Sequence, residues 1–189
     1  MKLTGKVKLY GLHDLPVRPA QGRVRKSLFD ILRGQVSGAR VLDLFAGTGS
    51  LGVEALLQGA AKCVFVDVDR DCAAALRENL VRLRLDTRAE VIRLDALRAV
   101  PILSGRSERF DIAFIAPPYA MFDSARGFRD FHRLLELLIG VKVLESTATV
   151  VIEHRLGQLD MLDVPGLARA DRHEYGQTHV TFLAPHGGT

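Results

Sequence analysis

The sequence has little cysteine and no long apolar run. Its two cysteines, Cys63 and Cys72, match no metal-ligand spacing, so we expect two reduced structural thiols rather than a zinc site or a disulfide framework. No segment approaches the roughly 20 apolar residues of a membrane-spanning helix. The first ten residues, MKLTGKVKLY, lack the apolar core of a signal peptide. We therefore expect a cytoplasmic protein that uses neither a membrane nor a metal.

Low-complexity tracts and internal repeats are also absent. The 189 residues are 48% hydrophobic and 25% charged, which is typical of a globular chain long enough to bury a core. The net charge of +4 is unevenly distributed. Residues 1–40 carry nine Lys or Arg against two Asp, a net +7, so the remainder carries −3. This asymmetry favours a basic appendage that docks on a polyanion, although a solvated lysine-rich surface would have the same composition.

The amino-terminal region, residues 1–37, is predicted to be a small extension. Residues 2–12 alternate apolar and basic side chains around two glycines, as a short hairpin does. Residues 24–32 place apolar side chains at helical spacing, with most of the basic ones on another face. We interpret residues 1–37 as an RNA-docking hairpin and helix, and residues 38–189 as the main domain.

From residue 40 the pattern alternates strand and helix. Apolar strand-like runs are ARVLDLF, KCVFVDV, AEVIRL, FDIAFIA and TATVVIEH. Helical patterns follow the first two runs and cover residues 125–140, with Asp69 as an N-cap, and two strands close the chain around Tyr175-Gly176. The predicted fold class is therefore α/β, a Rossmann-like sheet that is mostly parallel with an antiparallel last strand. In such sheets ligands bind beyond the carboxyl ends of the strands.

A glycine-rich loop, DLFAGTGSLG, follows the first of these strands. It contains Gly47-x-Gly49-x-x-Gly52, and Asp67 ends the next strand about 20 residues later. Glycines allow close approach of a ligand, and the carboxylate can accept hydrogen bonds from two ribose hydroxyls. NAD, FAD and S-adenosylmethionine all satisfy this pattern.

Two further acids narrow the choice of cofactor. Asp43 precedes the glycines, where a carboxylate is unfavourable beside a pyrophosphate but suits the ammonium of an amino acid. Asp95 follows the third strand and could accept from an adenine amino group. Each acid alone could instead be a helix N-cap, but the three together favour one cationic, adenosine-bearing ligand. A nicotinamide-dependent oxidoreductase remains a weaker alternative, because no acid/base pair follows the fourth strand.

FIAPPYAMF, residues 114–122, ends the fourth strand with two prolines. Proline cannot donate to a sheet ladder, so this segment must leave the sheet. The rigid turn would fix a backbone carbonyl, that of Pro117, toward the pocket, and Tyr119 could stack on a base extruded from RNA. The alternative is a purely structural strand terminator. The six histidines form no supported pair or triad, and we expect His154 to be structural.

These motifs together resemble class I S-adenosylmethionine-dependent methyltransferases. The chain is most similar to the RsmD-type guanine-N2 methyltransferases of bacterial small-subunit ribosomal RNA, over nearly its whole length. The segments that carry this resemblance are RPAQGRVRKSLFDIL, residues 38–69, FIAPPYA, VIEH and EYGQTHVTFL. The resemblance implies a monomer that binds S-adenosylmethionine and acts on ribosomal RNA or an assembling small subunit.

The resemblance also implies roles for individual residues. The implied cofactor-binding residues are Asp43, Phe45, Gly47, Thr48, Gly49, Gly52, Asp67, Val68, Asp95 and Ala96. The implied catalytic segment is Ala116, Pro117, Pro118 and Tyr119. The implied RNA contacts, which would position phosphates rather than read bases, are Arg18, Arg23, Arg25 and Lys26.

One position departs from the family pattern. Ala116 stands where enzymes that methylate exocyclic amines have Asp or Asn, and a methyl group accepts no hydrogen bond. Loss of such a contact can cost on the order of 3 kcal/mol in a preorganised site. Backbone carbonyls, a water or another carboxylate, such as Asp43 or Asp123, could substitute in an active enzyme. The alternative is a cofactor- and RNA-binding protein with weak or lost activity.

Overall fold

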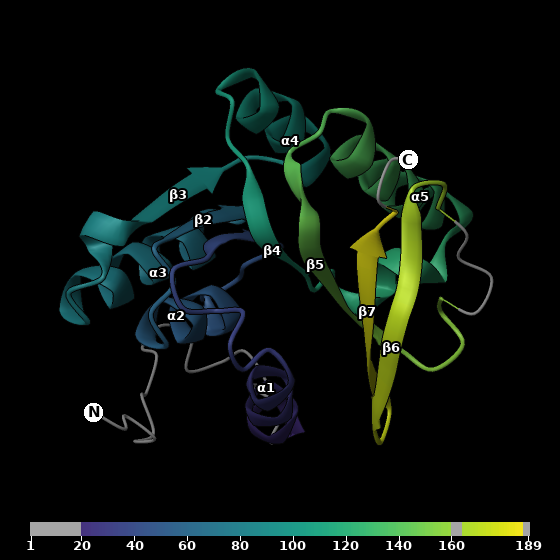
Figure 1. The fold of residues 1–189 in the computed structure, drawn as a ribbon, viewed down its shortest axis with the longest axis horizontal. Coiled ribbons are helices and arrows are strands. Elements are labelled where there is room, and N and C mark those ends of the chain that lie inside the picture. Colours follow the sequence, from purple (N-terminus) through teal and green to yellow (C-terminus); the bar gives the residue numbers. More distant parts are fainter. Residues whose placement is uncertain (1–19, 160–163, 187–189) are drawn as a thin grey trace.

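The computed structural model describes residues 20–159 and 164–186, which form a seven-stranded sheet with helices on both faces (Figure 1). The strands are β1 (Arg40–Leu44), β2 (Lys62–Asp67), β3 (Ala89–Arg93), β4 (Phe110–Ile115), β5 (Leu144–Arg155), β6 (Leu167–Tyr175) and β7 (Thr178–Pro185). Their order is β3-β2-β1-β4-β5-β7-β6. Strands β1 to β5 pair in parallel, and β7 is antiparallel to both β5 and β6. The predicted fold class and the antiparallel last strand are confirmed.

The helices divide between the two faces of the sheet. They are α1 (Ala20–Ile31), α2 (Ser50–Leu57), α3 (Arg70–Arg82), α4 (Ala96–Gly105) and α5 (Ala125–Gly140), with short 3-10 helices η1 (Asp86–Arg88) and η2 (Tyr119–Asp123). Helices α1, α2 and α3 share one buried core with the sheet, and α4 and α5 share the other. Both faces of β1, β2 and β4 are therefore buried, which explains their almost continuous apolar sequences.

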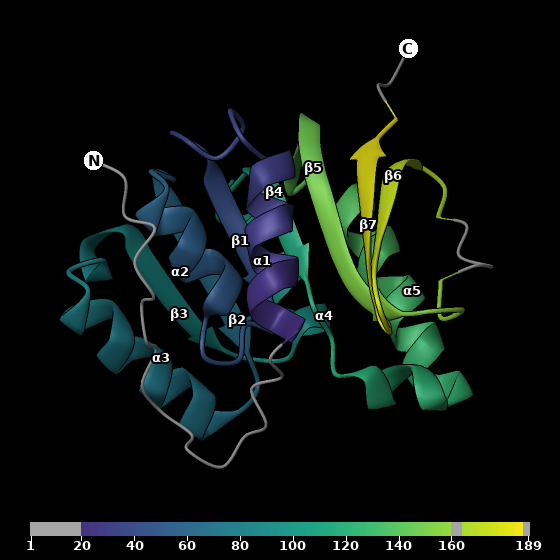
Figure 2. The same ribbon diagram turned by 90° about the horizontal axis from the view of Figure 1, so that it is seen from below.

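The strand order places a switch point beside β1. The chain runs outward from β1 to β2 and β3, then returns to the other side of β1 as β4. The loops that leave β1 and β4 consequently diverge from neighbouring strand ends, which opens a crevice in sheets of this kind. Figure 2 shows this edge at the bottom of the view, where β4 runs into η2 and where β6 turns into β7. The predicted site residues come from the loops at this edge.

Helix α1 packs closely on the sheet. Val24, Leu28 and Leu32 are buried on its inner face, and the Phe29 ring lies 5.8 Å from that of Phe114 in β4. The helix begins at Ala20, four residues before its predicted start at residue 24. Its first turn points toward the carboxyl edge of the strands (Figure 2). The hairpin predicted for residues 2–12 lies outside the described residues. The division at residues 37 and 38 stays a prediction.

Helix α4 is absent from the elements predicted from the sequence. Its segment contains Pro101, which has no N–H to donate within the helix and is unfavourable in a helix interior. The helix forms because Ala99, Val100 and Leu103 bury an apolar face against the sheet and α5. Tertiary packing thus outweighs the local propensity. By contrast, α5 spans the predicted residues 125–140, and Asp69 caps α3 as predicted by accepting from two backbone N–H groups.

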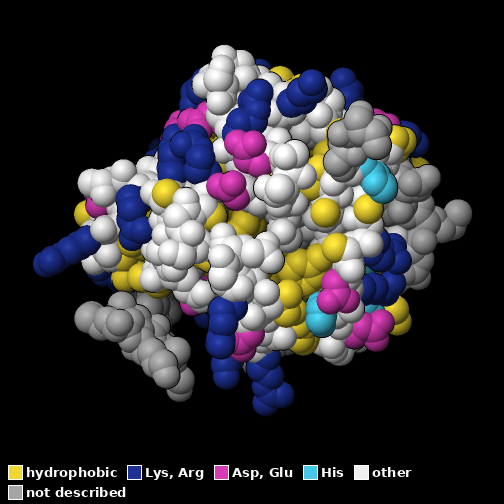
Figure 3. Space-filling model, viewed as in Figure 1, with side chains coloured by type: hydrophobic (Ala, Val, Ile, Leu, Met, Phe, Trp, Pro, Cys, Tyr) yellow, Lys and Arg dark blue, Asp and Glu magenta, His cyan; other side chains and the backbone are white. Residues whose placement is uncertain are grey.

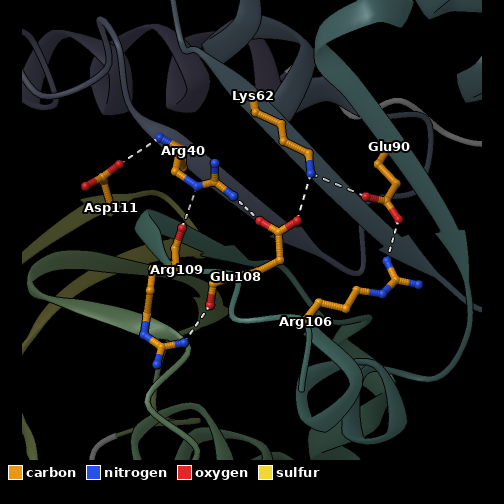
Figure 4. Close-up of polar contacts among 7 residues, drawn as sticks. All are labelled: Arg40, Lys62, Glu90, Arg106, Glu108, Arg109 and Asp111. Atoms are coloured by element: carbon orange, nitrogen blue, oxygen red, sulfur yellow. Dashed lines mark hydrogen bonds and ion pairs between the residues drawn. The ribbon is translucent and has the colours of Figure 1, made fainter. Parts of the chain in front are cut away.

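The amino ends of the parallel strands carry a network of charged side chains. Glu108, just before β4, pairs with Arg40 at the start of β1 and with Lys62 at the start of β2, whose Nζ lies 2.9 Å away (Figure 4). Glu90 in β3 extends the network to Lys62 and to Arg106. Figure 3 shows Lys and Arg side chains interspersed with Asp and Glu on this side of the molecule, rather than a patch of one sign. The network ties four strand starts together at the end of the sheet opposite the predicted site.

The described ranges contain neither a membrane-spanning helix nor a cluster of metal ligands. None of the helices there is both long and apolar enough to cross a bilayer. Across residues 20–159 and 164–186, no group of three or more His, Cys, Asp or Glu side chains could hold a metal ion. His154 is buried, and its Nε2 lies 2.8 Å from the Thr181 hydroxyl, which fits the structural role expected for it.

Candidate active site

The glycine loop after β1 owes its shape to backbone conformations that favour glycine. Gly47 and Gly49 have φ values of 54° and 85°, in the left-handed region. A Cβ atom on Gly49 would collide with Leu76 of α3, so this glycine also permits close packing. A Cβ on Gly47 would meet no atom within 4 Å. Gly47 therefore faces open space, where a ligand can approach the backbone directly.

Asp43 lies beneath this loop rather than on its surface. Its side chain is only 2% exposed, and Oδ2 accepts a hydrogen bond from the Gly52 amide at 2.9 Å. Burial raises the pKa of Asp43 to about 7; the Gly52 hydrogen bond opposes this shift, and the charge of Asp67 adds to it. The carboxyl group thus joins β1 to α2 and titrates near neutral pH. Its expected contact with a ligand ammonium stays a prediction.

Asp67 joins the end of β2 to the same loop. Its Oδ2 accepts from the Gly47 amide at 2.6 Å, and its Oδ1 accepts from the Asp69 amide at 2.8 Å. The next side chain, Val68, is apolar yet 69% exposed. A partly exposed carboxylate beside an exposed apolar side chain offers hydrogen-bond acceptors for a ribose and a surface for an adenine ring. These residues therefore fit the adenosine part of S-adenosylmethionine.

Asp95 and Ala96 lie at the start of α4. Asp95 is exposed and caps this helix, because its Oδ1 accepts from the Leu97 amide at 3.0 Å. The alternative interpretation, a helix N-cap, thus describes Asp95 in this structure. It does not describe Asp43 or Asp67, which brace the glycine loop instead. A role for Asp95 toward an adenine amino group stays a prediction.

The Pro-Pro-Tyr segment leaves the sheet directly after β4. The Ala116 amide still donates to the Leu44 carbonyl, at 3.4 Å, while Pro118 begins the turn into η2 and its carbonyl accepts from Met121. Because Leu44 and Ile115 are register partners, this segment starts beside the glycine loop. The structure therefore brings the predicted cofactor loop and the predicted target-base segment to one edge.

Tyr119 is held in place by residues of β5, of β7 and of the turn that follows β5. Its hydroxyl lies 3.2 Å from Glu153 Oε1 in β5 and 3.0 Å from Thr178 Oγ1 in β7. The Arg155 guanidinium lies over its ring, 4.7 Å from the centroid. Gln158 donates to its backbone carbonyl at 3.4 Å. Tyr119 is thus a fixed aromatic platform, half-buried at the carboxyl edge.

The sequence assigned no role to Glu153, Arg155 or Thr178. They are 34 to 59 residues from Tyr119 along the chain and reach it only because β5 and β7 are neighbours in the sheet. The one signal available was that VIEH and the terminal segment contribute to the family resemblance. Without the strand order, nothing linked those segments to the Pro-Pro-Tyr turn.

The predicted RNA contacts on α1 differ in their surroundings. Arg23 and Lys26 are exposed, whereas Arg25 is half-buried and lies 3.7 Å from Glu54 of α2. Arg18 lies outside the described residues. The hydroxyl of Ser27 on the same helix lies 2.6 Å from that of Tyr175 at the end of β6. Helix α1 therefore lines the same edge as the candidate active site.

The sheet order, the glycine loop after β1 and the acid at the end of β2 define a class I methyltransferase fold. The model of the family described as "Conserved hypothetical protein 95" matches residues 3–184. The chain belongs to this family.

Curated relatives and solved structures agree with this membership. "Putative rRNA methyltransferase YlbH" of Bacillus subtilis is 33% identical over 90% of this chain and 89% of its own. "Ribosomal RNA small subunit methyltransferase D" of Haemophilus influenzae is 36% identical over 59% of this chain and 58% of its own. A solved structure, "Putative methyltransferase yhhF from Escherichia coli", is 26% identical with a TM-score of 0.76, covering 90% of this chain and 88% of its own. The RsmD-type resemblance found in the sequence is confirmed.

Proposed function

We propose that this protein transfers a methyl group from S-adenosylmethionine to the exocyclic N2 amine of a guanine in small-subunit ribosomal RNA. The coarser part of this assignment, an S-adenosylmethionine-dependent rRNA methyltransferase, follows from the family and its named relatives. The identity of the target, the N2 amine of a guanine in the small-subunit RNA, is the finer part of the assignment. It is supported by the names of the RsmD relatives and by the Pro-Pro-Tyr turn.

The observation that carries the proposal is the position of that turn. Ala116 follows Ile115 at the strand end beside the glycine loop, so a base bound against Tyr119 lies next to the cofactor site. The Tyr119 hydroxyl contacts β5 and β7, and the Arg155 guanidinium lies over one face of the ring, so we assign base stacking to the opposite face. Stacking of one base on an aromatic side chain contributes about 1–3 kcal/mol, which offsets part of the cost of extruding that base.

The residues of the glycine loop bind and orient the cofactor. The open approach at Gly47 admits the ligand to the backbone, Asp67 accepts from the ribose hydroxyls, and Val68 packs against the adenine. When bound, S-adenosylmethionine supplies a methyl group already activated by the positive charge on sulfur. The remaining task of the protein is to hold the amine lone pair in line with that methyl group, about 3 Å away.

The Pro-Pro-Tyr turn orients the amine. The guanine N2 lone pair is delocalised into the ring, so acceptors for its N–H bonds favour the geometry in which the nitrogen can react. We assign one of these acceptors to the carbonyl of Pro117, because the carbonyl of Pro118 accepts from Met121. Arg23 and Lys26, on α1 at the same edge, contact RNA phosphates and set the position of the RNA strand.

Methyl transfer tests the proposal directly. The purified protein is incubated with labelled S-adenosylmethionine and small subunits, or their RNA, from cells that lack the enzyme, and the labelled nucleotide is mapped. We expect label on the N2 of one guanine. A Gly47→Trp variant, whose side chain fills the ligand approach, is the inactive control. Cofactor and RNA binding without incorporation would contradict the proposal, as would NADH binding in place of S-adenosylhomocysteine in calorimetry.

A further inference from the structure

The candidate site has no side-chain hydrogen-bond acceptor at position 116, because this residue is alanine. The adjacent strand, β5, carries a carboxylate, that of Glu153. Ile115 and Ile152 are register partners in the parallel pair of β4 and β5, so Ala116 and Glu153 follow side by side at the carboxyl edge. Side chains alternate faces along a strand. Because Phe114 and Val151 both belong to the core beneath α1 to α3, Ala116 and Glu153 project toward that same face.

The contacts of Glu153 place its carboxylate at the target-base platform. Its Oε1 lies 3.2 Å from the Tyr119 hydroxyl, which also contacts Thr178. A glutamate side chain is one methylene longer than that of aspartate, and adjacent strands lie only about 4.8 Å apart, so the carboxylate can extend from β5 toward the end of β4. A carboxylate has about four acceptor positions, so it can accept from Tyr119 and from a second donor at once.

Neither substitute considered from the sequence has this placement. Asp43 is buried and accepts from the Gly52 amide beneath the glycine loop. Asp123 is exposed at the far end of η2, four residues beyond Tyr119. Glu153, by contrast, contacts the Tyr119 hydroxyl directly.

We propose that the Glu153 carboxylate accepts a hydrogen bond from the target amine and then takes its proton, in place of the acceptor that Ala116 does not provide. This inference rests on the proposed function. As the amine nitrogen forms its bond to the methyl carbon with its own lone pair, the carbon–sulfur pair stays on sulfur and the nitrogen becomes cationic. The nitrogen then gives one of its two protons to Glu153, which passes it to water. The negative charge of Glu153 stabilises the charge that develops on nitrogen.

A purely structural role is the competing explanation, in which Glu153 only holds Tyr119. Two substitutions separate the roles. Tyr119→Phe removes the hydroxyl contact and keeps the ring, and Thr178→Val removes the other partner of that hydroxyl. Both leave the Glu153 carboxylate in place, so they measure what the Tyr119 contact alone contributes.

The test combines Glu153→Gln with a carboxylate restored on the neighbouring strand. We expect Glu153→Gln to lower kcat on the order of a hundredfold, with unchanged S-adenosylhomocysteine affinity, unchanged KM for RNA and an unchanged melting temperature. Tyr119→Phe and Thr178→Val should each lower kcat less than about tenfold. Ala116→Asp should raise kcat at least about tenfold in the Glu153→Gln background, a larger gain than in the wild type, where two carboxylates would repel each other.

Three outcomes would overturn the inference. An active Glu153→Gln variant, an equal loss in Tyr119→Phe, or no rescue by Ala116→Asp would each assign Glu153 a structural role only. These results require an active wild-type protein, so they leave the proposed function standing. An inactive wild type would overturn the proposed function and this inference with it.

Discussion

The hydroxyl groups of Ser27 and Tyr175 lie 2.6 Å apart, which joins α1 to the end of β6 across 148 residues of chain. This hydrogen bond fixes α1, with Arg23 and Lys26, at the edge that holds the Pro-Pro-Tyr turn. Helix α1 and strand β6 are far apart in the sequence, and this contact sets how the helix that we propose to contact RNA sits relative to the candidate site.

Removal of this hydrogen bond should weaken RNA recognition more than cofactor binding. We expect Ser27→Ala and Tyr175→Phe each to raise KM for RNA several-fold and to lower the free energy of unfolding by about 1 kcal/mol. S-adenosylhomocysteine affinity, measured by calorimetry, should stay constant because the glycine loop is untouched. The double variant should be no worse than either single one. Additive losses would instead show that the two hydroxyls act separately.

Gly47 and Gly49 should respond differently to the same substitution. Gly49→Ala introduces a Cβ that collides with Leu76 at a φ of 85°, so we expect a loss of stability of several kcal/mol by chemical denaturation. Gly47→Ala meets open space and adds only the strain of a φ of 54°, about 1–2 kcal/mol. It should keep the fold but bind S-adenosylhomocysteine more weakly. Full cofactor affinity in Gly47→Ala would contradict the direct approach of the ligand to this backbone.

Asp43 should make folding stability depend on pH. Because burial raises its pKa from 3.8 to about 7, the folded state binds a proton that the unfolded state releases between these values. The contribution of this group to the free energy of unfolding therefore decreases as pH rises from about 4 to 7 and is constant above that. Asp43→Asn, which keeps an oxygen for the Gly52 amide, should remove this dependence. An unchanged pH profile in the variant would show that Asp43 titrates normally.

The same group provides a test of the predicted ammonium contact. A bound cation near Asp43 lowers the pKa of its carboxyl group, so cofactor binding near pH 6.5 should release a fraction of a proton. Calorimetry in buffers with different ionisation enthalpies measures that proton. The release should vanish in Asp43→Asn. Binding without proton release in the wild type would place the ammonium elsewhere.

The charge network at the amino ends of the strands should contribute stability without affecting catalysis. The hydrogen bond and charge of Lys62, together with Arg40, hold the pKa of Glu108 below its usual range. This contribution is present above the unfolded-state pKa and is lost as pH falls through the folded-state value. We expect Glu108→Gln to cost about 1–2 kcal/mol near neutral pH, less in high salt, with kcat unchanged. A change in kcat would mean that this end of the sheet communicates with the site.

Local sequence patterns were sufficient for the parts of the fold that depend on neighbouring residues. The parallel strands are buried on both faces and are therefore apolar runs, the glycine loop needs left-handed backbone, and Asp69 caps the helix that follows it. The cofactor loop, the acid at the end of β2 and the proline-rich end of β4 could be predicted for these reasons. Helix α4 could not be predicted, because its stability comes from burial against the sheet and α5, which outweighs the cost of Pro101.

The sequence by itself thus determined the class of fold, the position of the cofactor loop and the missing acceptor at Ala116. Only the tertiary structure decided which residues surround Tyr119 and what could replace that acceptor. Glu153 reaches the site because β5 pairs beside β4 in a register that sets Ile152 against Ile115, and Thr178 reaches it because β7 pairs antiparallel to β5. Strand order and register are non-local properties of the whole sheet, so a pattern read along one segment does not contain them.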